Sequence, residues 1–440
     1  MRPSKARLSL PGSDELNYES LLSRFDGSAG TKIELLGHSR TGRRIPLVTV
    51  GEGSRSVLVV GAPHPNEPTG CLTILRLLAE LTTHPELSET PDWQWHFIPA
   101  IDLDGIALNQ KWFGDSPDLE AYLKHFYRPP FRLQPEYSFP LALPHYSFSA
   151  ETPESICWRR ALEIAQPQLQ CSLHGADTGG SFFLLSSECP DLAAQLVRLP
   201  ASFGIALNEV GEFFAEMEVF EPGVFAFPSV TEIIAHDVSR GDAPGTSWTA
   251  GNSSAGFALD SLGSFSMTCE VPIWRDAREG DRSASGRTVG DVVDDQIDQL
   301  REDAEILTAS LPKLHPRVES FEGQALIESL EDSLSGTIGL VSALTRARPH
   351  GADDRPLRKH DLVVAESGTY GLRTSAMLLR LATLLRDPAI EAVSRAVLDR
   401  RLSGYLRSAR LSPIPLAQAT GLQMAAIRAA IRFLSEGPEA

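Results

Sequence analysis

Short apolar runs alternate with segments of helical periodicity over the first 290 residues. Residues 45–50 and 57–62 are rich in β-branched side chains and are bounded by glycine and proline, a pattern typical of buried strands. Residues 68–81 follow with apolar side chains at helical spacing. The same patterns predict a helix at 153–166 and strands at 95–101, 169–173, 182–186 and 265–271. This order of strands and helices predicts an α/β layer around a largely parallel sheet.

The pattern changes after about residue 290. The stretches at 292–311 and 325–346 are long, acidic and rich in residues that favour helices. Three further stretches, rich in Ala, Leu and Arg, follow at 370–386, 389–407 and 415–434. We therefore expect a helical extension that packs on the α/β part.

The composition is that of an ordinary globular protein. Of the 440 residues, 42% are hydrophobic and 22% are charged, which excludes a disordered or fibrous chain. The 40 Lys and Arg residues against 57 Asp and Glu residues give a net charge of −17, so binding to nucleic acid or to an anionic membrane surface is not expected. No apolar stretch is long enough to span a bilayer, and the start of the chain lacks the apolar run of a signal peptide, so we expect a cytoplasmic protein. The five cysteines are scattered without a C-x-x-C pair, which favours neither a disulfide framework nor a cysteine zinc site.

His64 and Glu67 stand between the predicted strand at 57–62 and the helix that follows it. A His and a Glu three residues apart at such a turn can both reach one point beyond the end of the strand. Imidazole nitrogen and carboxylate oxygen are the ligands that zinc accepts in hydrolytic sites. The alternative is a solvated loop histidine with Glu67 in the first helical turn, where the helix dipole stabilises it.

His174 lies at the end of the predicted strand at 169–173 and is followed by the small residues Gly175 and Ala176. In α/β folds, functional side chains gather beyond the carboxyl ends of the strands, so His174 can face the same crevice as His64. The alternative is a hydrogen-bonded histidine at a strand terminus. His96 lies inside an apolar strand, which favours a role in the core. The histidines in polar or Pro/Gly-rich stretches are predicted to lie at the surface, namely His84, His315, His350 and His360.

Glu270 lies inside an apolar strand, next to Cys269 and Val271. A carboxylate in such surroundings is costly to bury without a partner. Because side chains alternate along a strand, Cys269 and Glu270 should face opposite sides of the sheet. One interpretation is a buried Glu paired with an arginine or with backbone amides. The other is a general base whose pKa is tuned by a dry site and a neighbouring cation.

Several segments of the chain, taken in order, resemble the zinc carboxypeptidases of the carboxypeptidase A type, the M14 family. The resemblance covers roughly residues 15–275. It is carried by the segments 37–43 (GHSRTGR), 61–70 (GAPHPNEPTG), 98–105 (IPAIDLDG, similar to the P-x-x-N-P-D-G turn of the family), 153–155 (PES), 172–174 (SLH) and 268–272 (TCEVP).

The resemblance implies roles for four of these residues. His64, Glu67 and His174 match the ligands of one zinc ion per chain, and Glu270 matches the catalytic glutamate. It also implies a mixed, mainly parallel sheet of about eight strands with helices on both faces. With this fold we expect an N-terminal lead-in at 1–30, a catalytic domain at 31–290 and the helical C-terminal extension at 291–440.

The chain departs from the family at the residues that bind the substrate. The family holds the terminal carboxylate of its substrate with an Asn-Arg pair, and here Gln110 follows Asn109. The aspartate that normally supports a ligand histidine is replaced by Ala107. Asn109 therefore carries over as a substrate-binding residue, whereas Lys111, Arg128 or Arg132 could supply the missing positive charge. Arg128 is the better candidate, for catalysis as well as for binding, because a guanidinium matches carboxylate geometry.

The tyrosine that the family carries between its last ligand and its catalytic glutamate is also absent. These departures favour a specialised substrate. The acidic residues of the same stretch, Glu209, Glu212, Glu216 and Glu218, either line the cleft and select a basic group or form a solvated acidic loop.

Three functions remain as hypotheses. The first is a zinc-dependent amide hydrolase, in particular a metallocarboxypeptidase that acts on a peptide or a modified peptide with Glu270 as general base. The second is a deacylase of N-acyl amino acids, of the aspartoacylase kind, which shares the ligands and the base. The third is a binding module that keeps the fold without catalysis.

Overall fold

A mixed nine-stranded sheet forms the centre of the computed structural model, which describes residues 31–83, 92–114, 116–212, 217–347, 355–367 and 370–436. Its strands, in spatial order, are β1 (Thr31–His38), β2 (Arg44–Val50), β4 (Trp93–Ile98), β3 (Arg55–Gly61), β7 (Leu169–Ala176), β11 (Phe265–Pro272), β8 (Phe182–Leu185), β10 (Val224–Ala226) and β9 (Val219–Glu221). The four central strands β4, β3, β7 and β11 are parallel to one another. On either side of them, β2 pairs antiparallel with β4 and β8 pairs antiparallel with β11. The predicted α/β fold, a mixed sheet with a mainly parallel core, is confirmed; the sheet has nine strands where about eight were expected.

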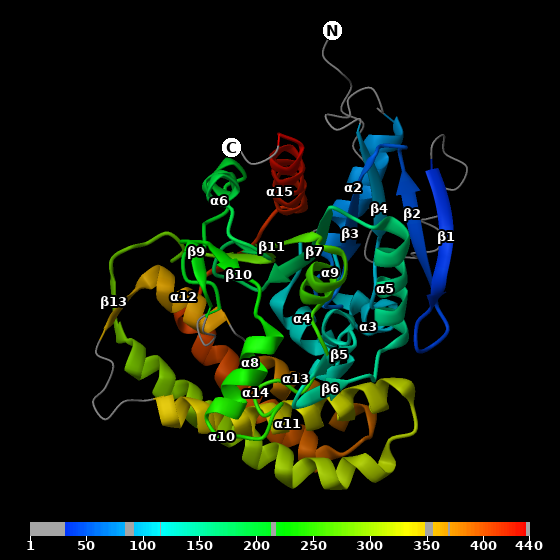
Figure 1. The fold of residues 1–440 in the computed structure, drawn as a ribbon. Helices are drawn as coiled ribbons and strands as arrows, with labels where there is room; N and C mark the ends of the chain where they lie inside the picture. The colour runs from blue at the N-terminus through cyan, green and yellow to red at the C-terminus, as the bar shows by residue number, and fades with distance from the viewer. Residues whose placement is uncertain are drawn as a thin grey trace.

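Helices cover both faces of this sheet (Figure 1). The first face packs against α2 (Thr69–Thr83), α6 (Pro190–Leu196) and α15 (Leu416–Glu436). The opposite face packs against α5 (Pro153–Ala165) and α9 (Ser254–Leu262). Cys269 is buried on the first face, as the alternation along β11 predicts.

The sequence pattern missed β1, β9 and β10. β1 is an edge strand with a half-exposed, partly charged face, so it has no apolar run to detect. β9 and β10 are three residues long, and strands of this length carry too few positions for a periodicity. The predicted helix at 153–166 agrees with α5, which starts at Pro153 behind the N-cap Thr152.

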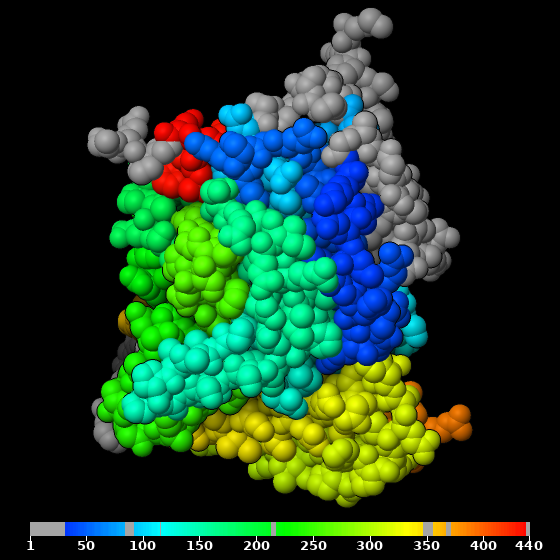
Figure 2. Space-filling view, turned by 45° about the vertical axis from the view of Figure 1, so that its right-hand side comes forward, coloured from blue at the N-terminus to red at the C-terminus, as the bar shows by residue number. Residues whose placement is uncertain are grey.

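A second, helical layer lies below the sheet in Figure 1, and Figure 2 shows part of it as a yellow block beneath the α/β part. Its helices are α10 (Val289–Leu314), α11 (Phe321–Ala347), α12 (Lys359–Ser367), α13 (Tyr370–Leu384) and α14 (Pro388–Ser408). The chain enters this layer after β12 (Trp274–Asp276) and leaves it through β15 (Leu411–Pro413), and these two strands pair antiparallel.

The last helix, α15, returns to the sheet and shares its core with α2. Gln423 in this helix donates from Nε2 to the carbonyl oxygens of His174, at 2.9 Å, and Cys269, at 3.3 Å. The Oγ1 of Thr73 in α2 donates to the Oε1 of Gln423 at 2.6 Å. The domain boundary expected at residue 290 stays a prediction, and these contacts join residues 416–436 to the α/β core. Among the described residues, no helix has the length and apolarity needed to cross a membrane.

The turn between β4 and α3 (Leu103–Asn109) holds a buried acid, Asp102. Its Oδ1 accepts from the N–H of Gly105 at 2.9 Å, which caps α3, while its Oδ2 has no hydrogen-bond partner among the described residues. Burial raises the pKa of Asp102 to about 7, although Arg40 opposes the rise. The turn of the zinc carboxypeptidases has asparagine at this place, and a protonated carboxyl group resembles its amide in shape and charge.

We expect Asp102→Asn to stabilise the protein above pH 7. In the folded state the group keeps its proton up to about pH 7, whereas in the unfolded chain it loses it near its ordinary pKa of about 4. Stability therefore falls as the pH rises between these values. A pKa rise of this size corresponds to a cost of roughly 4 kcal/mol, which the amide would remove. Urea unfolding of the metal-free protein between pH 4 and pH 8 measures the effect. Asp118→Asn at the exposed N-cap of α4 (Leu119–His125) is the control, and an equal gain in both variants would contradict the explanation.

Candidate metal centre

Three neighbouring parallel strands carry the candidate residues at their carboxyl ends. His64 and Glu67 follow β3, His174 lies near the end of β7, and Glu270 lies directly beside His174 in the register of β11. The N-terminus of α2 lies so close to β7 that a Cβ atom on Gly70 would be 2.8 Å from the carbonyl oxygen of Leu173. A glycine at this place therefore lets Glu67 reach His174.

His64, Glu67 and His174 present three donor atoms to one point. The Nδ1 of His64 lies 3.1 Å from the Nδ1 of His174 and 3.2 Å from the Oε2 of Glu67. The Nδ1 of His174 lies 3.3 Å from the Oε2 of Glu67. Tetrahedral ligands at zinc distances of about 2.0–2.1 Å stand about 3.3 Å from one another. The mutual distances of the three donors therefore suit one zinc ion.

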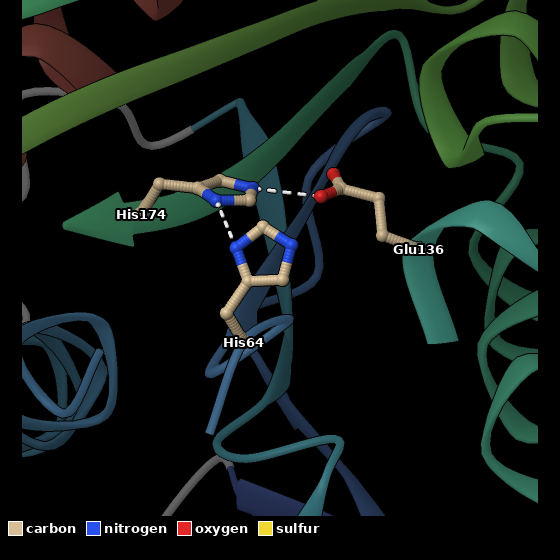
Figure 3. Close-up of side chains that lie close together, drawn as sticks. All are labelled: His64, Glu136 and His174. Atoms are coloured by element: carbon tan, nitrogen blue, oxygen red, sulfur yellow. Dashed lines mark hydrogen bonds and ion pairs between the residues drawn. The ribbon is translucent and has the colours of Figure 1, made fainter. Parts of the chain in front are cut away.

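A second carboxylate, Glu136, contacts the other edge of the same imidazole (Figure 3). Its Oε2 lies 2.9 Å from the Nε2 of His174, and its side chain is 3% exposed. His64, Glu136 and His174 also offer ligand atoms within 4.8 Å of one another. One ion cannot contact both ring nitrogens of His174. The donors of His64, Glu67 and His174 lie closer together and are therefore the better ligand set. Glu136 then orients the imidazole ring of His174.

No pattern in the sequence indicated a role for Glu136. It lies in the short turn η4 (Pro135–Tyr137), and its two flanking residues offer no metal-ligand spacing. Only the approach of this turn to β7 brings it to His174. The Nε2 of His64 has no hydrogen-bond partner among the described residues, in keeping with Ala107 at the place of the supporting aspartate.

The electrostatics of the three donors suit a cation. Burial and the charge of Arg128 lower the pKa of His64 to about 4, so its ring is neutral. Burial acts to raise the pKa of Glu67, but the two histidines and Arg128 hold it well below its usual value. Burial acts to lower the pKa of His174, and Glu136 raises it well above the usual value. A metal ion would therefore displace one proton from His174, and Glu136 is placed to keep the other on Nε2.

Glu270 faces this centre from β11. Its Oε1 lies 3.7 Å from the Nδ1 of His174, and its side chain is 14% exposed. Burial raises the pKa of Glu270 to about 8, with His174 opposing the rise and Glu67 and Glu212 adding to it. A positive ion on the three donors would lower this pKa and leave Glu270 as a carboxylate able to accept a proton.

Arg128 lies next to the carboxylate of Glu67. Its Nη1 lies 3.6 Å from the Oε1 of Glu67, and its side chain is 27% exposed, so it reaches both the centre and the solvent. Lys111 is exposed in η2 (Gln110–Trp112), where its charge acts on His125. No contact of Lys111 with the three donors or Glu270 appears among the described residues.

Asn109 is fully buried, and its amide is already engaged. Its Nδ2 donates to the carbonyl oxygens of Gly105 and Tyr127, and its Oδ1 accepts from the N–H of Tyr127 and the Nε1 of Trp112. These four bonds use all the hydrogen-bonding positions of the amide. The substrate-binding role predicted for Asn109 therefore stays a prediction, and its contacts give it a role in shaping the loop of Arg128.

Aromatic side chains lie beside the proposed metal donors. Tyr137 is half-buried; its ring centroid lies 6.0 Å from that of His64, and it packs against Phe131 and Trp248. Glu212 is exposed, and its charge raises the pKa of Glu270, so it stands near the centre. Glu209 pairs instead with Arg282 and Arg358, and Glu216 lies outside the described residues.

One family profile matches part of the chain. Residues 24–122 match the sequence profile of the family described as zinc carboxypeptidase, which confirms the resemblance seen in the sequence. No curated protein matches the chain.

Solved structures of metallopeptidases are similar to the chain at low identity. A metallo-carboxypeptidase from Burkholderia cenocepacia is 15% identical, with 58% of this chain and 59% of that chain covered and a TM-score of 0.34. A putative metallopeptidase from Shewanella baltica OS155 is 15% identical, with 59% and 84% covered and a TM-score of 0.40. A metallo-carboxypeptidase from Pseudomonas aeruginosa, in complex with (2-guanidinoethylmercapto)succinic acid, is 19% identical, with 58% and 59% covered and a TM-score of 0.33. The chain thus spans 59% of the length of the Burkholderia and Pseudomonas proteins.

Proposed function

We propose that this chain, a divergent relative of the zinc carboxypeptidases, is a zinc-dependent amide hydrolase, in particular a metallocarboxypeptidase that acts on a peptide or a modified peptide. One observation carries the proposal: the Nδ1 atoms of His64 and His174 and the carboxylate of Glu67 lie within 3.3 Å of one another, with Glu270 beside them. Zinc held by these donors would supply a Lewis acid and lower the pKa of a water molecule.

The residues around the donors supply the remaining steps. Glu270 takes the proton of the attacking water and passes it to the nitrogen that leaves. Arg128 stabilises the negative charge that develops on the carbonyl oxygen or binds the terminal carboxylate of the substrate. Glu136, whose Oε2 lies 2.9 Å from the Nε2 of His174, favours a proton on that nitrogen by its negative charge and so leaves the Nδ1 lone pair for the ion.

Metal analysis and substrate profiling test the proposal together. We expect one zinc per chain after reconstitution, and hydrolysis that a chelator abolishes. Peptides with free and with blocked C-termini are compared with N-acyl amino acids by mass spectrometry of the products. Cleavage that requires a free C-terminus supports a carboxypeptidase, whereas cleavage of N-acyl amino acids alone would make the chain a deacylase. A chain that binds less than stoichiometric zinc after reconstitution and hydrolyses none of these amides would be a binding module.

Replacement of Glu136 is expected to weaken zinc binding without abolishing it. Loss of a carboxylate that holds a ligand histidine lowers metal affinity by about 10- to 100-fold. Glu136→Ala should show this loss in competition with a chelator, and Glu136→Gln a smaller one, because an amide oxygen can still accept the Nε2–H. Glu154→Gln is the matched control, since Glu154 is equally buried but bonds Arg40 instead of a ligand. If Glu136→Ala lost zinc while Glu67→Ala retained it, Glu136 would be the ligand in place of Glu67.

A further inference from the structure

The segment that carries Arg128 has no regular structure of its own. It leads from the end of α4 at His125 to η3 (Phe131–Leu133) and contains Pro129 and Pro130, which have no N–H to donate. Buried backbone carbonyls in such a segment need partners from elsewhere in the protein. The source of these partners shows what holds Arg128 in place.

Helix α13 supplies the first set of partners. Arg380 donates from Nη1 to the carbonyl oxygens of His125, at 2.8 Å, and Phe126, at 3.2 Å, and from Nη2 to that of Leu108, at 3.0 Å. Glu322 in α11 accepts from its Nε at 2.8 Å and fixes the guanidinium. The side chain of Arg380 is 12% exposed, so these bonds are shielded from water.

Helix α11 supplies the second set. The Oγ of Ser329, a buried residue, donates to the carbonyl oxygen of Arg128 itself at 2.7 Å. The Oδ2 of Asp332 accepts from the N–H of Phe131 at 2.9 Å. Asn109 completes the set from the α/β side by binding both backbone groups of Tyr127.

We propose that α11 and α13 act as the scaffold of the Arg128 loop, so that the helical layer positions one residue of the catalytic cleft. The proposal rests on the proposed function for the role of Arg128 and on the described contacts for the role of the helices. Two helices that lie 201 to 255 residues further along the chain bond to four of the seven residues from 125 to 131. Arg380, Ser329 and Asp332 are positioning residues, because they contact the loop and not the donors of the metal centre.

Hydrogen exchange of the metal-free protein tests the scaffold directly. Arg380→Met removes three bonds to the backbone and should raise deuterium uptake in peptides covering 126–131. Arg401→Met is the matched control, because Arg401 is as shielded and pairs with Glu302 and Asp303, and none of its described contacts is with the loop. In Arg380→Met we expect deuterium uptake to rise at residues 126–131. In Arg401→Met we expect it to rise around Arg401 and to stay unchanged at 126–131. Unchanged uptake at 126–131 in Arg380→Met, or an equal rise there in both variants, would overturn the proposal.

Catalysis provides a second measurement. With a substrate that the wild-type protein hydrolyses, Arg380→Met and Ser329→Ala should lower kcat/KM by about 10- to 100-fold, the effect of a misplaced group of this kind. Zinc affinity should stay at the wild-type value, since no ligand is touched. Loss of zinc together with activity would mean general damage and would count against a positioning role. If the wild-type protein hydrolyses no amide, the proposed function is refuted. The hydrogen-exchange experiment would still show whether α11 and α13 hold the Arg128 loop in place.

Discussion

Glu270→Gln is expected to abolish measurable amide hydrolysis while the protein keeps its zinc. Glutamine has the shape of glutamate but cannot accept the proton of the attacking water, and a general base contributes about 10²- to 10⁴-fold to the rate. Because Glu270 lies 3.7 Å from His174 and belongs to a different strand from the three ligands, its replacement leaves the donor set intact. Single-turnover rates and metal analysis of the same sample measure the two properties.

Glu212→Gln is the control for this experiment. Glu212 also lies near the metal donors, where its charge raises the pKa of Glu270. It is exposed, and the proposed mechanism assigns it no proton transfer. We expect a modest change in rate from this variant. An equal loss in both variants would point to the summed negative charge of the cleft, and unchanged activity in Glu270→Gln would refute its role as the base.

Replacement of His174 by alanine is expected to remove zinc altogether. The variant loses one of the three proposed metal donors. It also removes the imidazole that lies between the carboxylates of Glu67 and Glu136. Zinc content should fall from one per chain to a small fraction. The zinc-dependent rise in melting temperature should vanish with it, because a ligand stabilises only the state that binds it.

His96→Ala is the matched control for the ligand experiment. His96 is as buried as His174, but it lies in β4 and its Nδ1 is 3.0 Å from the hydroxyl of Thr49. The variant should lose stability and keep its zinc. Retention of zinc by His174→Ala would refute the proposed ligand set, whereas loss of zinc by both variants would show only that the fold had been damaged.

The order of strands and helices could be predicted because periodicity is a local property. The predicted strand at 57–62 and helix at 68–81 agree with β3 and α2, and the spacing of His64 and Glu67 placed both donors at one turn. His174 and Glu270 could be found because a polar side chain at the end of a parallel strand, or inside an apolar one, is unusual. His96 in the core follows from the same reasoning.

Residues whose role depends on a distant partner could not be found in this way. His360 was expected at the surface, as is true of His315, but it is buried where its Nδ1 meets the N–H of Gly280. His84 and His350 lie outside the described residues. A polar neighbourhood in the sequence does not reveal that another segment will cover it.

The sequence by itself determined the α/β order, the four candidate residues at the strand ends and the change to helices after about residue 290. Only the tertiary structure decided that Glu136 meets His174, that α15 shares the core of the sheet and that Arg380 holds the loop of Arg128. The physical reason is the range of the interactions. Backbone preferences and side-chain alternation act over a few residues, whereas these contacts join residues separated by 38 to several hundred positions and arise only from packing.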